Sequence, residues 1–220
     1  ALALQWAPGW LAPEMAARLP FIALLVLTLL ATWYTVYYLA RSPGAQPVAF
    51  AFGGEAHPKD YARSMADAGL LALLACLGLA QLSHEITSYL AQLACTALVF
   101  FAAAIQPYHP RRAAVAMPLG MAGLALAGAP TLATLLGLGC AALAWWAPAS
   151  TADRRRTAAL AWIVGTLTSM GLAWALDLWA WRIEPPRAFL PYATTMARML
   201  VWFGWPAWPL ALWTLWRWRR

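Results

Sequence analysis

Residues 81–89 read QLSHEITSY and place His84 beside Glu85 between two long apolar stretches. An imidazole titrates near neutral pH and a carboxylate can accept a proton, so this pair could carry acid–base or electrostatic chemistry at the mouth of a cavity. The alternative is a tight turn at a membrane interface. In that turn Ser83 caps the next helix, and Glu85 complements the positive end of the helix. The residues alone leave both interpretations open.

A later connection holds three arginines, Arg182, Arg187 and Arg198. Because the planar guanidinium group matches phosphate oxygens, Arg182 and Arg187 could hold an anionic headgroup. Tyr192 is close enough in sequence to join such a phosphate or donor site. The alternative is that these arginines extend to lipid headgroups, as long basic side chains do at membrane interfaces.

Asp177 is the one acid within the apolar stretch GLAWALDLWAWR. An ionisable residue there could pair with a cation inside a helix bundle, in a structural or relay role, or it could reach the interface beside Arg182. The three cysteines lie inside apolar stretches. Their odd number and their spacing indicate neither a disulfide framework nor a metal site, and no cofactor is indicated.

Composition determines the environment of these residues. Of the 220 residues, 63% are hydrophobic and 10% are charged, whereas a soluble domain carries about 25% charged residues. Uncharged stretches long enough to cross a bilayer recur along the chain. The sequence therefore predicts an all-α, polytopic transmembrane helix bundle, with residues 1–220 as a single domain. The start of the chain lacks an initiator methionine and a signal peptide, which indicates part of a longer protein.

Seven spans can be drawn, given that a span needs about 17 to 25 residues. They are residues 19–40, 68–82, 86–105, 113–129, 131–147, 157–181 and 200–216. The fourth and fifth spans form a hairpin that turns at Pro130. Pro206 and Pro209 predict a kink in the last span, because proline removes a backbone hydrogen bond.

The predicted spans are rich in Ala, Gly, Ser and Thr. Small residues let helices approach closely in lipid, where the hydrophobic effect does not drive helices together. The second span is expected to extend backward as a helix through residues 60–69. The apolar stripe of that extension is predicted to consist of Tyr61, Met65 and Ala68.

The basic residues predict which side of the membrane each connection faces. Eleven of the fifteen Lys and Arg residues lie in connections after odd-numbered spans, and four lie on the other side. The positive-inside rule places the group of eleven in the cytoplasm. His84, Glu85 and the connection 182–198 then share the outer face. The net charge of +7 reflects this topology rather than nucleic-acid binding, because the basic residues form no basic face.

Three stretches together resemble bacterial integral-membrane glycosyltransferases of the GT-C type, which are related to lipid A aminoarabinose transferase and protein mannosyltransferases. They are WLAPEMAARLPFIALLVLTLLATWYTVYYLAR, LSHEITSYLAQLACTALVFFAAA and FLPYATTMARMLVWFGWPAWPLALWTLWR. The resemblance covers most of the chain. Its more specific parts are the AARLP entry into the first helix and the Pro-Trp helix near the end.

This resemblance implies transfer of a sugar from a polyprenyl-phosphate donor to a lipid or protein acceptor. The reaction would take place at the periplasmic face of the bacterial inner membrane, as in lipid A modification. Glu85 matches a position where the family has an acidic residue, normally Asp, and His84 precedes it here. The family's main catalytic acid lies in an external loop, and this chain is expected to begin after that loop.

Two other functions fit the residues. A proton- or ion-coupled transporter could use Asp177, His84 and Glu85 as a relay. Such a transporter would be expected to show repeated half-structures with broken helices, and the sequence has no convincing internal repeat. In a non-catalytic membrane assembly subunit, the polar residues would merely anchor the helices.

Overall fold

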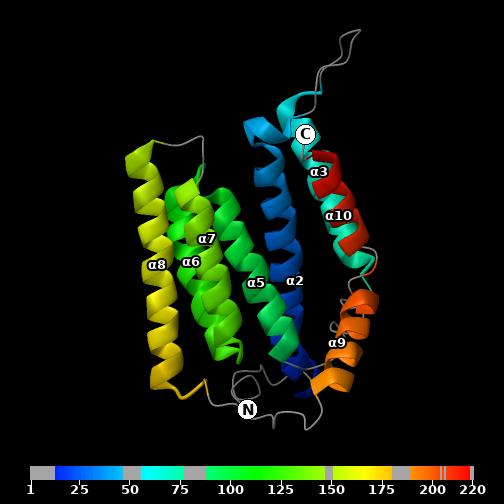
Figure 1. Cartoon of the computed structure of the whole chain (residues 1–220), viewed down its shortest axis with the longest axis vertical. Coiled ribbons are helices and arrows are strands. Elements are labelled where there is room, and N and C mark those ends of the chain that lie inside the picture. Colours follow the sequence, from blue (N-terminus) through cyan, green and yellow to red (C-terminus); the bar gives the residue numbers. More distant parts are fainter. Residues whose placement is uncertain are drawn as a thin grey trace.

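The computed structural model describes residues 13–46, 56–76, 88–146, 151–179, 189–203, 205 and 207–218. Regular structure in these ranges is entirely helical: α2 (Pro13–Ala40), the short 3-10 helix η1 (Pro43–Ala45), α3 (Pro58–Leu74), α5 (Ser88–Ile105), α6 (Pro110–Leu126), α7 (Pro130–Trp146), α8 (Ala152–Ala175), α9 (Phe189–Phe203) and α10 (Ala207–Trp218). Successive long helices from α2 to α8 alternate in direction, so most of their termini lie at one of two ends of a bundle (Figure 1). The predicted all-α bundle is confirmed.

Three described helices are long and apolar enough to cross a membrane, namely residues 18–40 of α2, the whole of α5, and α8. The helix α7 is also apolar but shorter. Because a span needs about 17 to 25 residues, these helices support a membrane protein with an all-helical fold.

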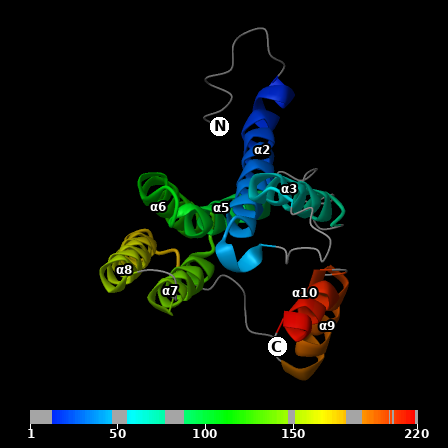
Figure 2. The same ribbon diagram turned by 90° about the horizontal axis from the view of Figure 1, so that it is seen from above.

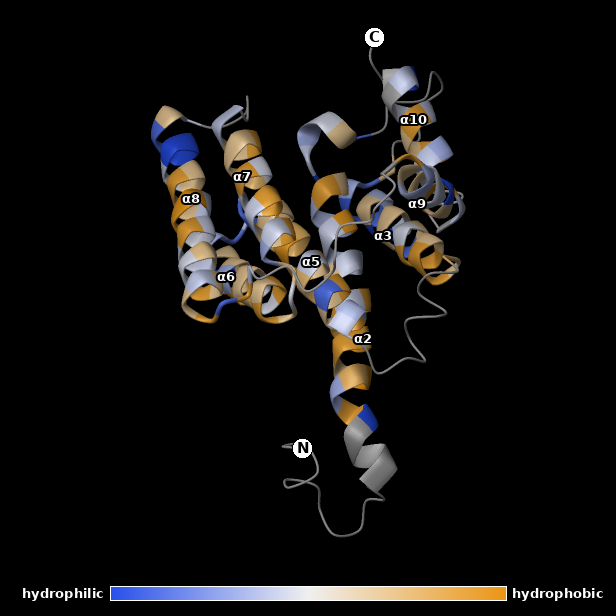
Figure 3. Cartoon of the chain, turned by 60° about the horizontal axis from the view of Figure 1, so that its bottom comes forward, coloured by the Kyte–Doolittle hydropathy of each residue, from blue (hydrophilic) through white to orange (hydrophobic). Residues whose placement is uncertain are grey.

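Bulky apolar side chains lie on the outside of the bundle. Leu30 on α2, Leu119 on α6 and Leu143 on α7 are all more than half exposed. Figure 3 shows hydrophobic residues at many positions along the helices. Large exposed apolar surfaces are a liability in water, whereas the hydrocarbon of a bilayer solvates them. The surface therefore agrees with the membrane environment that the composition predicts.

The helix α5 packs between α2 and α6, α8 packs against α6 and α7, and α3 packs on α2 (Figure 2). The main core cluster joins α5, α6, α7 and α8. Its largest buried side chains are Val99, Met121, Leu124 and Trp162. Most of the other buried residues are alanines. The predicted use of small residues between helices is therefore confirmed.

Gly137 shows how closely these helices approach one another. A Cβ atom added to Gly137 on α7 would lie 2.6 Å from Cε of Met121 on α6, and it would also collide with Oγ1 of Thr166 on α8. Both separations are shorter than ordinary van der Waals contact. Gly137 thus lets α7 pack against two neighbours at once.

We expect Gly137→Ala to lower the free energy of unfolding by about 1–3 kcal/mol, the usual cost of overpacking a core. Gly139 on the same helix is the matched control, because an added Cβ there has nothing within 4 Å. Gly139→Ala should be neutral or stabilise by up to about 1 kcal/mol through better helix propensity. Unfolding in mixed micelles measures both changes. Equal effects at the two positions would contradict this packing.

The helix α3 packs on α2 through residues other than the predicted stripe. Ala62 and Ala66 are fully buried, and Tyr61 is half-buried. Met65 is 41% exposed and Ala68 is exposed as well. The prediction for Met65 and Ala68 was wrong because the contact face follows the small residues Ala62, Ala66 and Gly69, and Met65 and Ala68 lie on other faces of the helix. In lipid, close helix contacts favour small side chains, while a bulky one such as Met65 can face the hydrocarbon.

The predicted hairpin between α6 and α7 is confirmed, and a glycine makes its turn. Gly128 has a φ of 85°, a left-handed conformation that glycine adopts without steric cost. The N–H of Gly128 donates to the carbonyl of Ala125 at 3.1 Å, and the N–H of Ala129 donates to that of Leu124 at 3.0 Å. These bonds end α6 in a Schellman motif, and Pro130 then begins α7.

The predicted kink near the end of the chain is a break between two helices. The helix α9 ends at Phe203 and α10 begins at Ala207. Across the break, Nε1 of Trp208 donates to the carbonyl of Val201 at 3.2 Å, which satisfies one of the carbonyls that a helix end leaves unpaired. Pro209 lies in the first turn of α10. An N–H there would have no helical partner, so this proline causes no second break.

Candidate functional site

The described basic residues separate toward the two ends of the bundle. We call one end the arginine-rich end; it comprises the ends of α2, α7 and α10, the starts of α3, α6 and α8, and the α5–α6 turn. It carries nine of the eleven described Lys and Arg residues: Arg41, Lys59, Arg63, Arg111, Arg112, Arg154, Arg155, Arg156 and Arg217. The remaining two, Arg18 and Arg198, lie toward the opposite end. The predicted two-sided distribution is thus confirmed for the described residues.

His84, Glu85, Arg182 and Arg187 lie outside the described residues, so their roles stay predictions. Three of the four described elements that flank them nevertheless share one end of the bundle. The start of α5, the end of α8 and the start of α9 lie toward the opposite end (Figure 1), whereas α3 ends near the middle of α2, since Gly69 lies beside Val36. The two predicted parts of the site therefore attach to the bundle at the same end.

Asp177 lies just beyond the end of α8 rather than inside a span. It has a φ of 50° and its side chain is exposed. Its N–H donates to the carbonyl of Trp174 at 3.1 Å, and the N–H of Leu178 donates to that of Ala173 at 2.8 Å. This is again a Schellman motif, and aspartate is among the residues that tolerate its left-handed position.

One prediction about this segment is therefore corrected. The sixth span does not continue as a helix beyond Ala175, since residues 176–179 form a turn. Among the described residues no cation lies within salt-bridge distance of Asp177, so the pairing alternative has no partner there and the relay role stays a prediction. The exposed position agrees with the interface alternative, while Arg182 lies outside the described residues.

If Asp177 serves as a helix terminator, Asp177→Gly and Asp177→Asn should keep both stability and function. Asp177→Val should lower the free energy of unfolding by about 1–2 kcal/mol, because a β-branched residue is strained at positive φ. Thermal unfolding and an activity assay on the three variants measure these effects. Loss of activity in Asp177→Asn at unchanged stability would instead assign the carboxylate a relay role.

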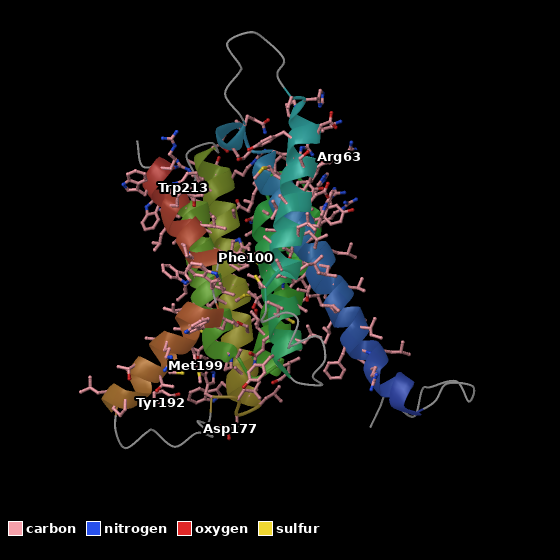
Figure 4. All side chains as sticks on the ribbon, turned by 90° about the vertical axis from the view of Figure 1, so that its right-hand side faces the viewer. Arg63, Phe100, Asp177, Tyr192, Met199 and Trp213 are labelled. Atoms are coloured by element: carbon pink, nitrogen blue, oxygen red, sulfur yellow. The ribbon has the colours of Figure 1, made fainter. Side chains whose placement is uncertain are left out.

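Tyr192 lies in the first turn of α9 and is 48% exposed. The predicted connection 182–198 is shorter than expected, because α9 begins at Phe189 and Arg198 belongs to the helix. Figure 4 shows Asp177 and Tyr192 at the same end of the bundle. Figures 1 and 2 place α8 and α9 on different sides of it. The structure therefore brings these two residues to one end without bringing them together.

An apolar hollow of about 510 Å³ lies at this end, on the last turns of α8. It is lined by Met170, Gly171, Trp174 and Trp179. Tryptophan side chains are typical of the boundary between hydrocarbon and headgroups, so the hollow offers an apolar surface at that depth. The described residues contain no group of three or more His, Cys, Asp or Glu side chains that could hold a metal ion.

Sequence reasoning missed two polar contacts that join distant parts of the chain. Nε2 of Gln92 on α5 donates to the carbonyl of Ala127 at the end of α6, at 2.9 Å. Nε1 of Trp162 on α8 donates to Oε1 of Gln106 in the α5–α6 turn, also at 2.9 Å. In the sequence, Gln92 and Gln106 stand out only as isolated amide side chains in or beside an apolar stretch. This pattern does not identify a partner, because hydrogen bonds between helices in a membrane depend on which helix faces meet.

At the arginine-rich end, Arg41 joins α2 to the α5–α6 turn. Its guanidinium carbon lies 5.6 Å from the ring centre of Tyr37 and 5.4 Å from that of Tyr108, within the range of cation–π contacts. Burial raises the pKa of the Tyr108 phenol above its ordinary value, and the charge of Arg41 partly opposes this shift. The phenol thus stays protonated and neutral at physiological pH.

A second concavity, of about 460 Å³, lies between α6 and α8 at the arginine-rich end. Ala114 and Met117 of α6 and Arg154 and Ala161 of α8 are among the residues that line it. The first turn of α8 contains three arginines, Arg154–Arg156. Cations at a helix N-terminus are unfavourable by about 0.3–1 kcal/mol each. Helix stability therefore does not explain why these three arginines lie at the start of α8. The only role that the sequence predicts for them is to keep this end of the helix in the cytoplasm.

No family model matches this chain, and no curated protein and no solved structure matches it.

Proposed function

We propose that this chain is the transmembrane part of a bacterial glycosyltransferase. It would move a sugar from a polyprenyl-phosphate donor to a lipid or protein acceptor at the periplasmic face of the inner membrane. The resemblance of three stretches to GT-C enzymes suggests this chemistry. One structural observation supports its location: the start of α5, which follows His84 and Glu85, and the end of α8 and start of α9, which flank Arg182 and Arg187, lie toward the end opposite the arginine-rich end.

In this proposal the chain crosses the membrane seven times, through α2, α3, α5, α6, α7, α8 and the broken pair α9–α10. The chain direction supports an odd number of crossings, because α2 begins at the opposite end and α10 ends at the arginine-rich end (Figure 1). The positive-inside rule assigns the arginine-rich end to the cytoplasm. The opposite end then faces the periplasm.

The proposed reaction breaks the bond between the sugar and the donor phosphate and forms a bond from the sugar to the acceptor nucleophile. Arg182 and Arg187 hold the phosphate and stabilise the negative charge that develops on it as it leaves. Tyr192, at the start of α9, adds a hydroxyl to the same end. The apolar hollow lined by Trp174 and Trp179 offers a surface for the polyprenyl chain.

Glu85 and His84 supply the proposed acid–base part of the site. Glu85 precedes the start of α5 at Ser88, where the helix N-terminus favours its ionised form. As a carboxylate it would orient the acceptor nucleophile or stabilise the positive charge on the sugar ring, and His84 would share its proton. The principal catalytic acid belongs, by the resemblance, to an external loop that precedes these residues.

The test is sugar transfer by the whole enzyme in proteoliposomes supplied with a purified polyprenyl-phosphate-linked sugar. We expect transfer by the native protein. In Glu85→Gln transfer should fall by about an order of magnitude or more, the usual range for loss of acid–base catalysis, while donor binding and protein level stay intact. If Glu85 only complements the helix dipole, turnover stays near normal and stability falls by about 0.3–1 kcal/mol.

Asp153→Asn is the matched control, because Asp153 is an acid at the arginine-rich end of α8 and should not affect transfer. Normal turnover in both Glu85→Gln and His84→Ala would assign the pair to a structural turn. An ion flux in sealed vesicles without sugar transfer would instead identify a transporter. If the folded protein shows neither sugar transfer nor ion flux, a non-catalytic assembly subunit is favoured.

A further inference from the structure

The cleft between α6 and α8 has no role in the proposed sugar transfer, because it lies at the arginine-rich end. Its volume of about 460 Å³ falls within the range of about 300–1,000 Å³ that is usual for small-molecule sites. Ala114 and Met117 form part of one wall, and Ala158 and Ala161 form part of the other. Arg154, an exposed residue in the first turn of α8, supplies a charge to the lining.

The neighbourhood of this cleft is strongly basic. The first turns of α6 and α8 contain five arginines and one acid, Asp153. The arginines are Arg111, Arg112, Arg154, Arg155 and Arg156. Among the residues that the structure describes, none of the five has a carboxylate within 4.0 Å. Figure 3 shows the hydrophilic stretch at the start of α8 in contrast to the apolar helix that follows. The charge on this side of the cleft is therefore available to an anion.

Two exposed tryptophans indicate the depth of the cleft in the membrane. Trp145 and Trp146 end α7 beside the start of α8, and such residues gather at the boundary of hydrocarbon and headgroups. A smaller cleft of about 170 Å³ there is lined by Trp145, Ala152, Arg155 and Arg156. Arginines thus lie at headgroup level, while the alanine and methionine walls extend toward the hydrocarbon.

We propose that the cleft binds an anionic phospholipid of the cytoplasmic leaflet. The lipid phosphate lies against Arg154 and the first turns of α6 and α8, and one acyl chain lies between the alanine walls. An anionic phospholipid matches both halves of the cleft. A free phosphate would make no contact with the apolar walls, and a lipid without net charge would not neutralise the positive charge of the arginines. Basic pockets between helices on the cytoplasmic side are a recurrent form of lipid recognition.

Native mass spectrometry of the purified, delipidated chain tests this proposal. It counts bound phosphatidylglycerol and bound phosphatidylcholine with identical acyl chains. We expect a preference for phosphatidylglycerol that falls about five-fold in Arg154→Gln, the effect expected of one arginine near an anionic headgroup. The double variant Ala158→Leu/Ala161→Leu keeps every charge but fills the cleft, and it should reduce bound phosphatidylglycerol to a similar extent.

Arg217→Gln is the control, because Arg217 lies at the same end on α10 and does not line the cleft. If Arg217→Gln lowers the preference as much as Arg154→Gln does, the attraction is general and the proposal is wrong. An unchanged preference in the filled variant would also overturn it. Inorganic phosphate should fail to displace the lipid, and displacement would show a soluble-anion site instead. Helical content and melting temperature confirm that each variant is folded.

Discussion

Trp162→Ala is expected to lower the free energy of unfolding by about 3–5 kcal/mol, the range for removing a large aromatic side chain from a core. Trp162 is 1% exposed and belongs to the cluster that joins α5, α6, α7 and α8. Its removal also leaves Oε1 of Gln106 without its donor. Trp162→Phe keeps most of the side-chain volume but loses this hydrogen bond. Its free energy of unfolding should fall by about 0.6–1.7 kcal/mol, the contribution of one hydrogen bond between helices in a membrane.

Trp174→Ala is the matched control for this prediction. Trp174 lies on the same helix and is 84% exposed, so its replacement should change stability by no more than about 0.5 kcal/mol. Unfolding of the three variants in mixed micelles gives the comparison. A loss in Trp174→Ala equal to that in Trp162→Ala would show that the two residues are equally important, contrary to the packing described above.

The double substitution Arg182→Ala/Arg187→Ala should weaken binding of a polyprenyl-phosphate-linked sugar by roughly a hundred-fold to ten-thousand-fold. Each hydrogen bond to a charged group contributes about 1.5–3 kcal/mol, and this variant removes two such partners of the donor phosphate. Double replacement by lysine keeps the charge but loses the planar fork, so it should restore binding only in part. Equilibrium binding of labelled donor to the whole enzyme measures these changes.

Arg217→Ala provides the control for the arginine pair, since it removes one basic residue from the arginine-rich end. Donor affinity should be unchanged in this variant. If donor affinity is also unchanged in the double alanine variant, Arg182 and Arg187 do not hold the phosphate. The alternative that they contact lipid headgroups would then remain.

Much of the fold could be predicted because it depends on neighbouring residues in the chain. Apolar stretches predict helices of membrane length, and three described helices meet that criterion. Pro130 predicts the turn of the hairpin, because a proline cannot continue the preceding helix. The break between α9 and α10 likewise follows from proline, which has no N–H to donate. The separation of the arginines toward one end follows from the order of charged and apolar segments.

The candidate site could be predicted less well, since it depends on how elements meet. For Asp177 the sequence left open both pairing inside the bundle and a place at the interface, and only the structure shows the Schellman motif that places it outside the helix. Tyr192 was predicted to join a site with Arg182 and Arg187, which lie outside the described residues, so that grouping stays a prediction. Its helix α9 lies on a different side of the bundle from α8 (Figure 2). Hydropathy gives the depth of a residue along the membrane normal, and it does not give its position around the bundle.

The sequence by itself predicted the membrane environment, the presence of most helices and the end of the bundle at which the described arginines lie. The tertiary structure alone decided which helix faces are buried and which residues pair. Trp33 on α2 donates to Asp67 on α3 at 2.8 Å, although 34 residues separate them, and the cleft beside Arg154 needs both α6 and α8. The physical reason is that lipid solvates a bulky apolar face as well as a protein core does. Apolarity therefore does not mark the buried face, and close contact between small residues selects it.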